Sequence, residues 1–197
     1  YCADYLEIPR DRVHVISHTE GFIYYVLSQK KELWTNQVGL FELSGERLCY
    51  YEMKVQRGLR QSTVLAERER LEESFSLDVL NSGAGARIAD RILCSCGSRL
   101  LQKKLFSAIF LTGKGFENRD WAGEFMKLVC SRRRVYVEST LFAQGAMYRA
   151  ADFLREKSAY PFICICEGRL ESSVTMKVTS KDQESQLVLA RAGEAWY

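Results

Sequence analysis

The 197-residue sequence lacks several features that mark specialised classes of protein. Only two prolines are present, so long disordered or polyproline segments are not expected. No stretch approaches the roughly 20 consecutive apolar residues of a membrane-spanning helix, and no signal peptide is visible. The 28 basic and 25 acidic residues leave a net charge of +3, which is too small to indicate a nucleic-acid partner or an anionic membrane surface.

Cysteine and histidine patterns that bind metals are missing too. The seven cysteines are odd in number, and no two have the Cys-x-x-Cys spacing. Cys164 and Cys166 alternate along an apolar segment, so both are expected on one face of a strand. Free thiols acting as small hydrophobic side chains are the favoured interpretation, and unpaired thiols favour a reducing, cytoplasmic location. His14 and His18 have an i, i+4 spacing that joins two rings only on a helix, whereas His14 lies in a strand-like pattern, so no metal site is predicted.

The sequence does contain an ordinary globular balance of 47% hydrophobic and 27% charged residues, arranged as alternating strand and helix patterns. Residues 12–17 alternate and are β-branched, which predicts a strand. A helix is predicted to follow to about residue 31, with Thr19 as its N-cap. Strands at 37–43 and 47–55 are predicted to form a hairpin around the turn at 44–46, and the dense charges of 64–80 are typical of a solvated helix.

The second half of the chain continues the alternation. The helices expected there cover residues 86–103, 120–132 and 142–157, with strands at 108–112 and 135–137 between them. The strand at 108–112 is continuously apolar, as in a parallel sheet covered on both faces. Three more strands, at 162–166, 174–178 and 187–190, are predicted to form a small antiparallel β extension. The sequence thus predicts a main α/β domain over 1–157 and a β extension over 158–197.

Glycine occurs where a ligand could approach the backbone. The apolar strand ends in Gly113-Lys114-Gly115 and leads toward a helix, and glycine lacks the Cβ that keeps a ligand from backbone amides. A plain strand-to-helix turn gives the same pattern, so the motif alone does not decide between the two. The cations at 132–134 fit the carbonyl end of a helix better than a phosphate clamp. The sequence contains no Walker loop, nucleophile elbow or dinucleotide fingerprint.

The order of elements from Phe110 to Ala151 carries more information. An apolar strand, a Gly-x-Gly loop, a helix, a short strand and a helix opening with Gly145-Ala146 follow one another. This series resembles the C-terminal half of the actin and heat-shock-protein ATPase superfamily, in which a Gly-Gly adenosine loop follows the strand. Residues 13–22 resemble the family's preceding strand and helix, and the hairpin at 37–55 stands in the place of the second phosphate loop. The nearest resemblance is to an uncharacterised bacterial family of actin-like proteins, over about residues 13–153.

The resemblance implies a ribonuclease-H-like, actin-type mixed sheet of five strands flanked by helices. It also implies ATP or ADP with magnesium as ligand. An active second phosphate loop has the form Asp-x-Gly-Gly-Gly/Thr, whereas this sequence has Leu40-Phe-Glu-Leu-Ser-Gly-Glu46. The implied nucleotide contacts are Gly113, Lys114, Gly115 and Phe116 at the base and ribose, Ser44 and Gly45 near the phosphates, and, in an active enzyme, Glu20 and Glu42 near the metal and the attacking water.

The departures from this motif predict a degenerate nucleotide site. Phosphoryl transfer depends on positioning and electrostatic stabilisation, so loss of the glycine amides removes most of the catalytic machinery. The expected function is therefore assembly with itself or another protein, with weak or no nucleotide binding and no catalytic residues. One alternative is a magnesium-dependent ATPase completed by an N-terminal half, because the sequence opens at Tyr1 without Met and has the character of a fragment. A scaffold without any ligand is the third possibility.

Overall fold

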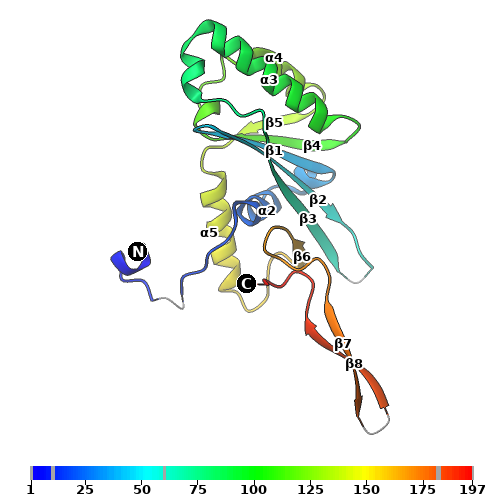
Figure 1. Cartoon of the computed structure of the whole chain (residues 1–197). Coiled ribbons are helices and arrows are strands. Elements are labelled where there is room, and N and C mark those ends of the chain that lie inside the picture. Colours follow the sequence, from blue (N-terminus) through cyan, green and yellow to red (C-terminus); the bar gives the residue numbers. More distant parts are fainter. Residues whose placement is uncertain (1, 10–11, 60, 181–182, 197) are drawn as a thin grey trace.

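A mixed six-stranded sheet forms the centre of the computed structural model, which describes residues 2–9, 12–59, 61–180 and 183–196 (Figure 1). The strands, in spatial order, are β5 (Arg134–Val137), β4 (Phe106–Thr112), β1 (Gln37–Ser44), β2 (Arg47–Gln56), β3 (Ser62–Arg70) and β6 (Phe162–Ile165). β2 runs antiparallel to both of its neighbours, whereas the β5–β4, β4–β1 and β3–β6 pairs are parallel. The predicted α/β class is confirmed, and the predicted number of five strands is corrected to six.

Helices cover both faces of this sheet (Figure 1). On one face α2 (His18–Ser28) and α5 (Leu141–Phe153) pack over a core that includes Leu40, Tyr51 and Phe110. On the other face α3 (Gly83–Leu101) and α4 (Gly123–Cys130) pack over a core that includes Phe41 and Leu111. Successive residues of a strand point to opposite faces, so neighbours such as Leu40 and Phe41 belong to different cores. The predicted helices of the second half are confirmed with other bounds: α3 begins and ends earlier than predicted, and α4 and α5 are shorter.

The N-terminal part differs from the sequence prediction. Residues 12–17 form no strand, and the Val15 side chain is 84% exposed. A period-two pattern marks a strand only where a neighbouring strand supplies hydrogen bonds, and the described part of this segment joins neither sheet. Ser17, not Thr19, is the N-cap of α2, because its hydroxyl oxygen accepts a hydrogen bond from the Glu20 amide at 3.1 Å. α1 (Cys2–Tyr5) precedes this segment.

The charged segment 64–80 is the clearest error, because its first part is strand β3 rather than a helix. Val64 and Ala66 are buried in the core under α2, and every residue from Thr63 to Arg70 pairs with β2. β6 pairs only with residues 62–65 of β3, so the charged end of β3 lies at an open edge of the sheet. Charged side chains are common on open edges, where they discourage pairing with other chains. A short 3-10 helix, η3 (Leu77–Asn81), then leads to α3.

The C-terminal strands divide between two sheets. β6 joins the main sheet, so it is not part of the predicted β extension. β7 (Val174–Ser180) and β8 (Gln183–Ala190) form a separate antiparallel hairpin that projects from the body (Figure 1). Among the described helices, none combines the length and apolar character needed to cross a membrane. The cysteines whose side chains are described are free thiols: Cys49, Cys94, Cys96, Cys130, Cys164 and Cys166.

Candidate functional site

The predicted nucleotide residues of the hairpin and of the Gly-x-Gly loop lie at the carboxyl ends of two central strands, β1 and β4. β1 and β4 are parallel neighbours, and Glu42 at the end of β1 lies opposite Thr112 at the end of β4. The chain then turns through Gly113 into a 3-10 helix, η4 (Lys114–Phe116), next to the last residues of β1. Ligands of α/β proteins commonly bind at this edge of a parallel sheet.

Both glycines of the loop are needed for close packing against β1. Gly113 has a φ of 93°, and a Cβ at this position would lie 2.6 Å from Ser44 Oγ. A Cβ on Gly115 would lie 2.5 Å from Leu43 Cγ, which is closer than carbon atoms approach. The backbone conformation and the neighbouring side chains therefore require glycine here even without a ligand.

The rest of the loop divides into a buried and an exposed part. Phe116 is fully buried and stacks on Trp121 and Phe125 in the core under α3 and α4. The Trp121 indole N–H donates a hydrogen bond of 3.0 Å to the Gly115 carbonyl oxygen. Lys114 is exposed. Phe116 is consequently a core side chain, and Lys114 is the loop residue whose side chain faces solvent.

The turn at the predicted second phosphate loop is tight. Ser44 pairs with Arg47, which leaves only Gly45 and Glu46 in the turn. Gly45 has a φ of 62° while Glu46 has no positive φ, as in a type II′ hairpin turn with glycine at its first central position. The positive φ that this turn requires therefore explains why glycine occupies position 45, with or without a ligand.

The carboxylate of Glu42 is engaged by its neighbours. The Tyr51 hydroxyl donates a hydrogen bond of 2.6 Å to Glu42 Oε2, and burial followed by this bond raises the pKa of Tyr51. The guanidinium of Arg68 lies 5.6 Å from the centre of the Tyr51 ring and donates to Cys49 Sγ at 3.6 Å. Tyr51 and Arg68 were missed at the sequence level, because Arg68 lies in the segment predicted as a helix and no short motif links β2 and β3 to Glu42.

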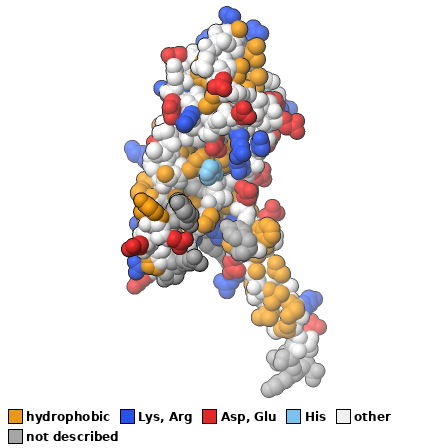
Figure 2. All heavy atoms as spheres, turned by 60° about the vertical axis from the view of Figure 1, so that its left-hand side comes forward, with side chains coloured by type: hydrophobic (Ala, Val, Ile, Leu, Met, Phe, Trp, Pro, Cys, Tyr) orange, Lys and Arg blue, Asp and Glu red, His pale blue; other side chains and the backbone are white. Residues whose placement is uncertain are grey.

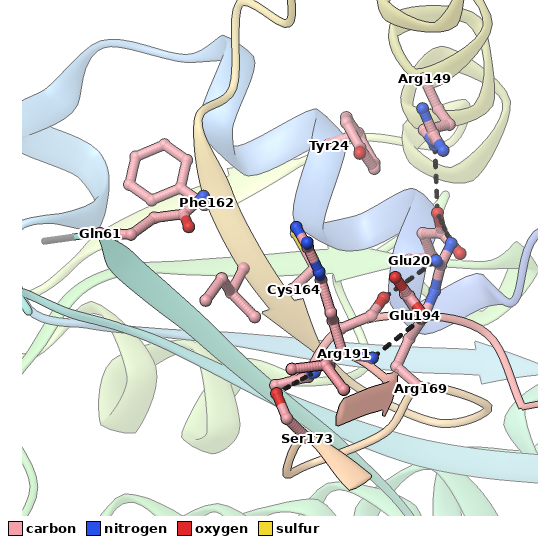
Figure 3. Close-up of a pocket in the computed structure, with 14 residues that line it drawn as sticks. Glu20, Tyr24, Gln61, Arg149, Phe162, Cys164, Arg169, Ser173, Arg191 and Glu194 are labelled. Atoms are coloured by element: carbon pink, nitrogen blue, oxygen red, sulfur yellow. Dashed lines mark hydrogen bonds and ion pairs between the residues drawn. The ribbon is translucent and has the colours of Figure 1, made fainter. Parts of the chain in front are cut away.

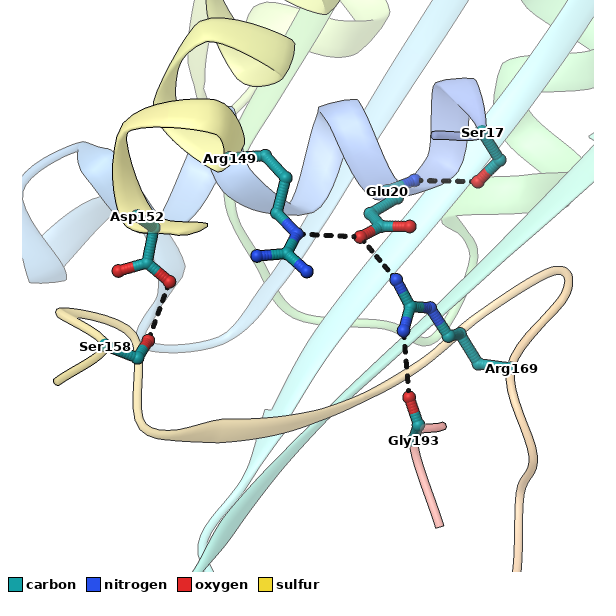
Figure 4. A network of polar contacts seen from close by, with 7 residues as sticks. All are labelled: Ser17, Glu20, Arg149, Asp152, Ser158, Arg169 and Gly193. Atoms are coloured by element: carbon teal, nitrogen blue, oxygen red, sulfur yellow. Dashed lines mark hydrogen bonds and ion pairs between the residues drawn. The ribbon is translucent and has the colours of Figure 1, made fainter. Parts of the chain in front are cut away.

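Glu20 belongs to a different group of charges, shown in Figure 4. Its carboxylate oxygen Oε1 accepts hydrogen bonds from Arg149 Nε at 3.2 Å and from a terminal nitrogen of Arg169 at 2.7 Å. The Glu20 side chain is only 4% exposed. Its partners come from α5 and from the loop after β6, rather than from β1, β2 or β4. Sequence separations of 129 and 149 residues explain why no local pattern could reveal these pairs.

This charged group borders a cavity of about 540 Å³ between α2, α5, β6 and the base of the β7–β8 hairpin (Figure 3). Tyr24, Cys164 and Arg191 line it together with Glu20 and the two arginines. Burial, and secondly the Glu20 carboxylate, raises the pKa of Cys164 to about 11. The thiol is therefore neutral near pH 7 and a poor nucleophile, so the cavity has the chemistry of a binding site rather than of thiol catalysis.

Fold and site together define an α/β protein with a mixed, helix-covered sheet and two groups of polar side chains at different places on it. The chain belongs to the family described as "Family of unknown function (DUF5716) C-terminal", whose model matches residues 1–167. No match is found among the curated proteins. The family match covers the sheet and its helices and ends before the β7–β8 hairpin.

Proposed function

We propose that this protein is an actin-like module with a ribonuclease-H-like sheet, which acts through assembly and carries a degenerate adenine-nucleotide site. The observation that supports the proposal is the convergence of three elements in one sheet. β1 of the hairpin and β4 before the Gly-x-Gly loop are adjacent, parallel and end at the same edge. β5 lies parallel to β4 and is followed by α5, the helix that contains Gly145. An actin-type half-molecule requires this convergence, with β6 as an additional edge strand.

The degeneracy of the site is supported by how its residues are used. Nucleotide phosphates need backbone amides that face an open space. The loop at Gly113 instead packs on Leu43 and Ser44, and the turn at Gly45 is a two-residue hairpin turn. One oxygen of the Glu42 carboxylate accepts a hydrogen bond from the Tyr51 hydroxyl, so that oxygen is already used within the protein. The described residues do not fit a magnesium–nucleotide complex, so no catalytic step is assigned to them.

The assembly role is supported by the β7–β8 hairpin. Met176 and Leu187 are directly paired on one face of this hairpin, and each is about half exposed. Figure 2 shows hydrophobic side chains gathered along the projecting hairpin. An isolated two-stranded hairpin is marginally stable in water, and exposed apolar patches mark interaction sites. The proposed partner of this face is a second copy of the chain, because the same apolar face on two copies can bury itself in a symmetric dimer.

A nucleotide experiment tests the degenerate site. We expect the protein with MgATP to release phosphate no faster than buffer and to show no saturable rise in melting temperature. Phosphate release above background that is lost in Glu42→Gln and kept in Glu46→Gln, the exposed carboxylate of the same turn, would establish the ATPase instead. Glu42→Gln keeps the size of the side chain and an oxygen that accepts from Tyr51, so the comparison isolates the charge.

A further inference from the structure

The cavity beside Glu20 is separate from the proposed nucleotide site. Neither the Gly113–Phe116 loop nor the Ser44–Gly45 turn contributes to its lining. Its volume of about 540 Å³ lies within the range of roughly 300–1,000 Å³ that holds small organic ligands. The apolar part of the lining comes from Tyr24, Phe162, Ile163 and Val188.

The charged lining has an excess of cations. Three arginines, Arg149, Arg169 and Arg191, and two carboxylates, Glu20 and Glu194, line the cavity. Arg149 and Arg169 both bind the same oxygen of Glu20. Their side chains are only 24% and 19% exposed. Arg149 thus shares its only ion-pair partner among the described residues and is poorly solvated, so a second anion in the cavity would stabilise its charge.

The neighbours of Arg149 hold its guanidinium in one orientation (Figure 4). Its Nε is bonded to Glu20, and its guanidinium lies over the rings of Tyr24 and Phe153, at 5.2 and 5.6 Å from their centres. Its two terminal nitrogens donate to none of the described residues. An arginine held in this way offers a planar pair of donors that matches a carboxylate or phosphate group, and little conformational entropy is lost when it binds.

Arg191 completes the cationic wall from the hairpin side (Figure 3). Its backbone amide donates to Glu194 Oε2 at 3.0 Å, which fixes the loop at the base of β8. Its guanidinium makes no hydrogen bond or ion pair with a described side chain. Arg149 and Arg191 therefore face one cavity from two different segments of the chain, each with unused donors.

We propose that this cavity binds a small organic anion through a carboxylate or phosphate group. Arg149 and Arg191 contact the oxyanion, Glu20 and Arg169 hold Arg149 and the C-terminal loop in place, and the apolar wall receives the organic part of the ligand. The inference is independent of the nucleotide site, because Glu20 is the only predicted nucleotide contact that lines this cavity, and the structure places it away from the loops at Gly113 and Gly45.

Titration calorimetry of the intact chain tests the proposal, with inorganic phosphate and benzoate as separate probes at constant ionic strength. We expect saturable binding of at least one probe. A charged hydrogen bond contributes about 1.5–3 kcal/mol, so Arg149→Lys, which keeps the charge but removes the planar fork, should weaken binding by roughly 10- to 150-fold. Arg191→Gln should also weaken it. Arg87→Gln is the control, because Arg87 is an exposed residue of α3 on the other face of the sheet. This variant should leave the affinity unchanged.

Two outcomes would overturn the proposal. One is the absence of saturable binding of both probes to the folded protein. The other is binding that Arg191→Gln leaves unchanged, and because Arg191 is exposed this variant remains informative if Arg149→Lys fails to fold. Phosphate binding that survives Lys114→Ala but not Arg191→Gln places the anion in this cavity, whatever the nucleotide experiment shows. A preference for phosphate or for benzoate then identifies which oxyanion the ligand carries.

Discussion

Gly145 allows α5 to approach the backbone of α2 at Gly21 closer than a side chain would permit. A Cβ on Gly145 would lie 2.9 Å from Gly21 Cα and would overlap the Gly21 carbonyl oxygen. Both neighbours are helix backbone, which cannot move as a flexible side chain can. The Gly145-Ala146 pair supported the family resemblance as a predicted helix opening, but α5 begins four residues earlier, at Leu141, and Gly145 has a packing reason within it.

Replacement of Gly145 by alanine should therefore destabilise the protein. Overpacking in a tight interface costs about 1–3 kcal/mol, which outweighs the gain of up to about 1 kcal/mol in helix propensity. Urea unfolding measures the change in the free energy of unfolding. Gly83→Ala is the matched control, because a Cβ at this helix position meets nothing within 4 Å. Equal unfolding midpoints for the two variants would contradict the close crossing.

The Glu20 carboxylate presents a second case in which burial decides the energetics. Glu20→Gln removes the charged oxygen that accepts hydrogen bonds from both Arg149 and Arg169, and removal of one partner of a buried pair costs roughly 3–5 kcal/mol. We expect a loss near the lower end of that range, because the arginine side chains keep 24% and 19% of their exposure. Glu124→Gln breaks an ion pair that is 67% and 76% exposed and should leave the unfolding midpoint unchanged. Equal effects of the two variants in urea unfolding would refute this account.

At the scale of elements, sequence patterns predicted correctly those helices and strands whose signals lie within a few neighbouring residues. The hairpin of β1 and β2 and the buried strand β4 were predicted because a turn signal and a continuous apolar run each fall within a few residues. The charged part of β3 was mistaken for a helix, because its strand character depends on pairing with β2 rather than on its own composition. β6 was placed in the extension because its partner strand is a hundred positions earlier, as the Ser62–Phe162 pair shows.

The apolar face of the β7–β8 hairpin gives a prediction at this scale. Met176→Glu would place a charge on that face and should abolish self-association, seen as a fall from dimer to monomer mass by sedimentation equilibrium. Thr175→Glu, on the opposite face of the same strand, adds the same charge and should leave the dimer intact. A wild-type protein that stays monomeric as its concentration rises, or equal behaviour of the two variants, would exclude a second copy as the partner.

For the molecule as a whole, the sequence located the loops of the candidate nucleotide site better than their chemistry. The family resemblance assigned Gly113 and Ser44 to one site, and the structure places them next to each other. The sequence could not show that this contact fills the space beside the glycines, since that depends on the Leu43 side chain across the sheet. The cavity beside Glu20 could not be predicted from the sequence for the same reason. Its residues come from α2, α5 and the C-terminal loops, and only the folded chain assembles them.

The parallel pairing of β6 with β3 has a consequence during synthesis on the ribosome. Residues 62–65 are made long before residues 162–165, so β3 must wait as the outermost strand while three helices and two strands are added. A waiting strand is exposed to capture by other nascent chains. The alternating acids and bases from Glu67 to Arg70 give this strand a repulsive, well-hydrated tip throughout that interval. These charges would keep the unfinished strand soluble, a role additional to the contacts that Arg68 and Glu69 make in the finished molecule.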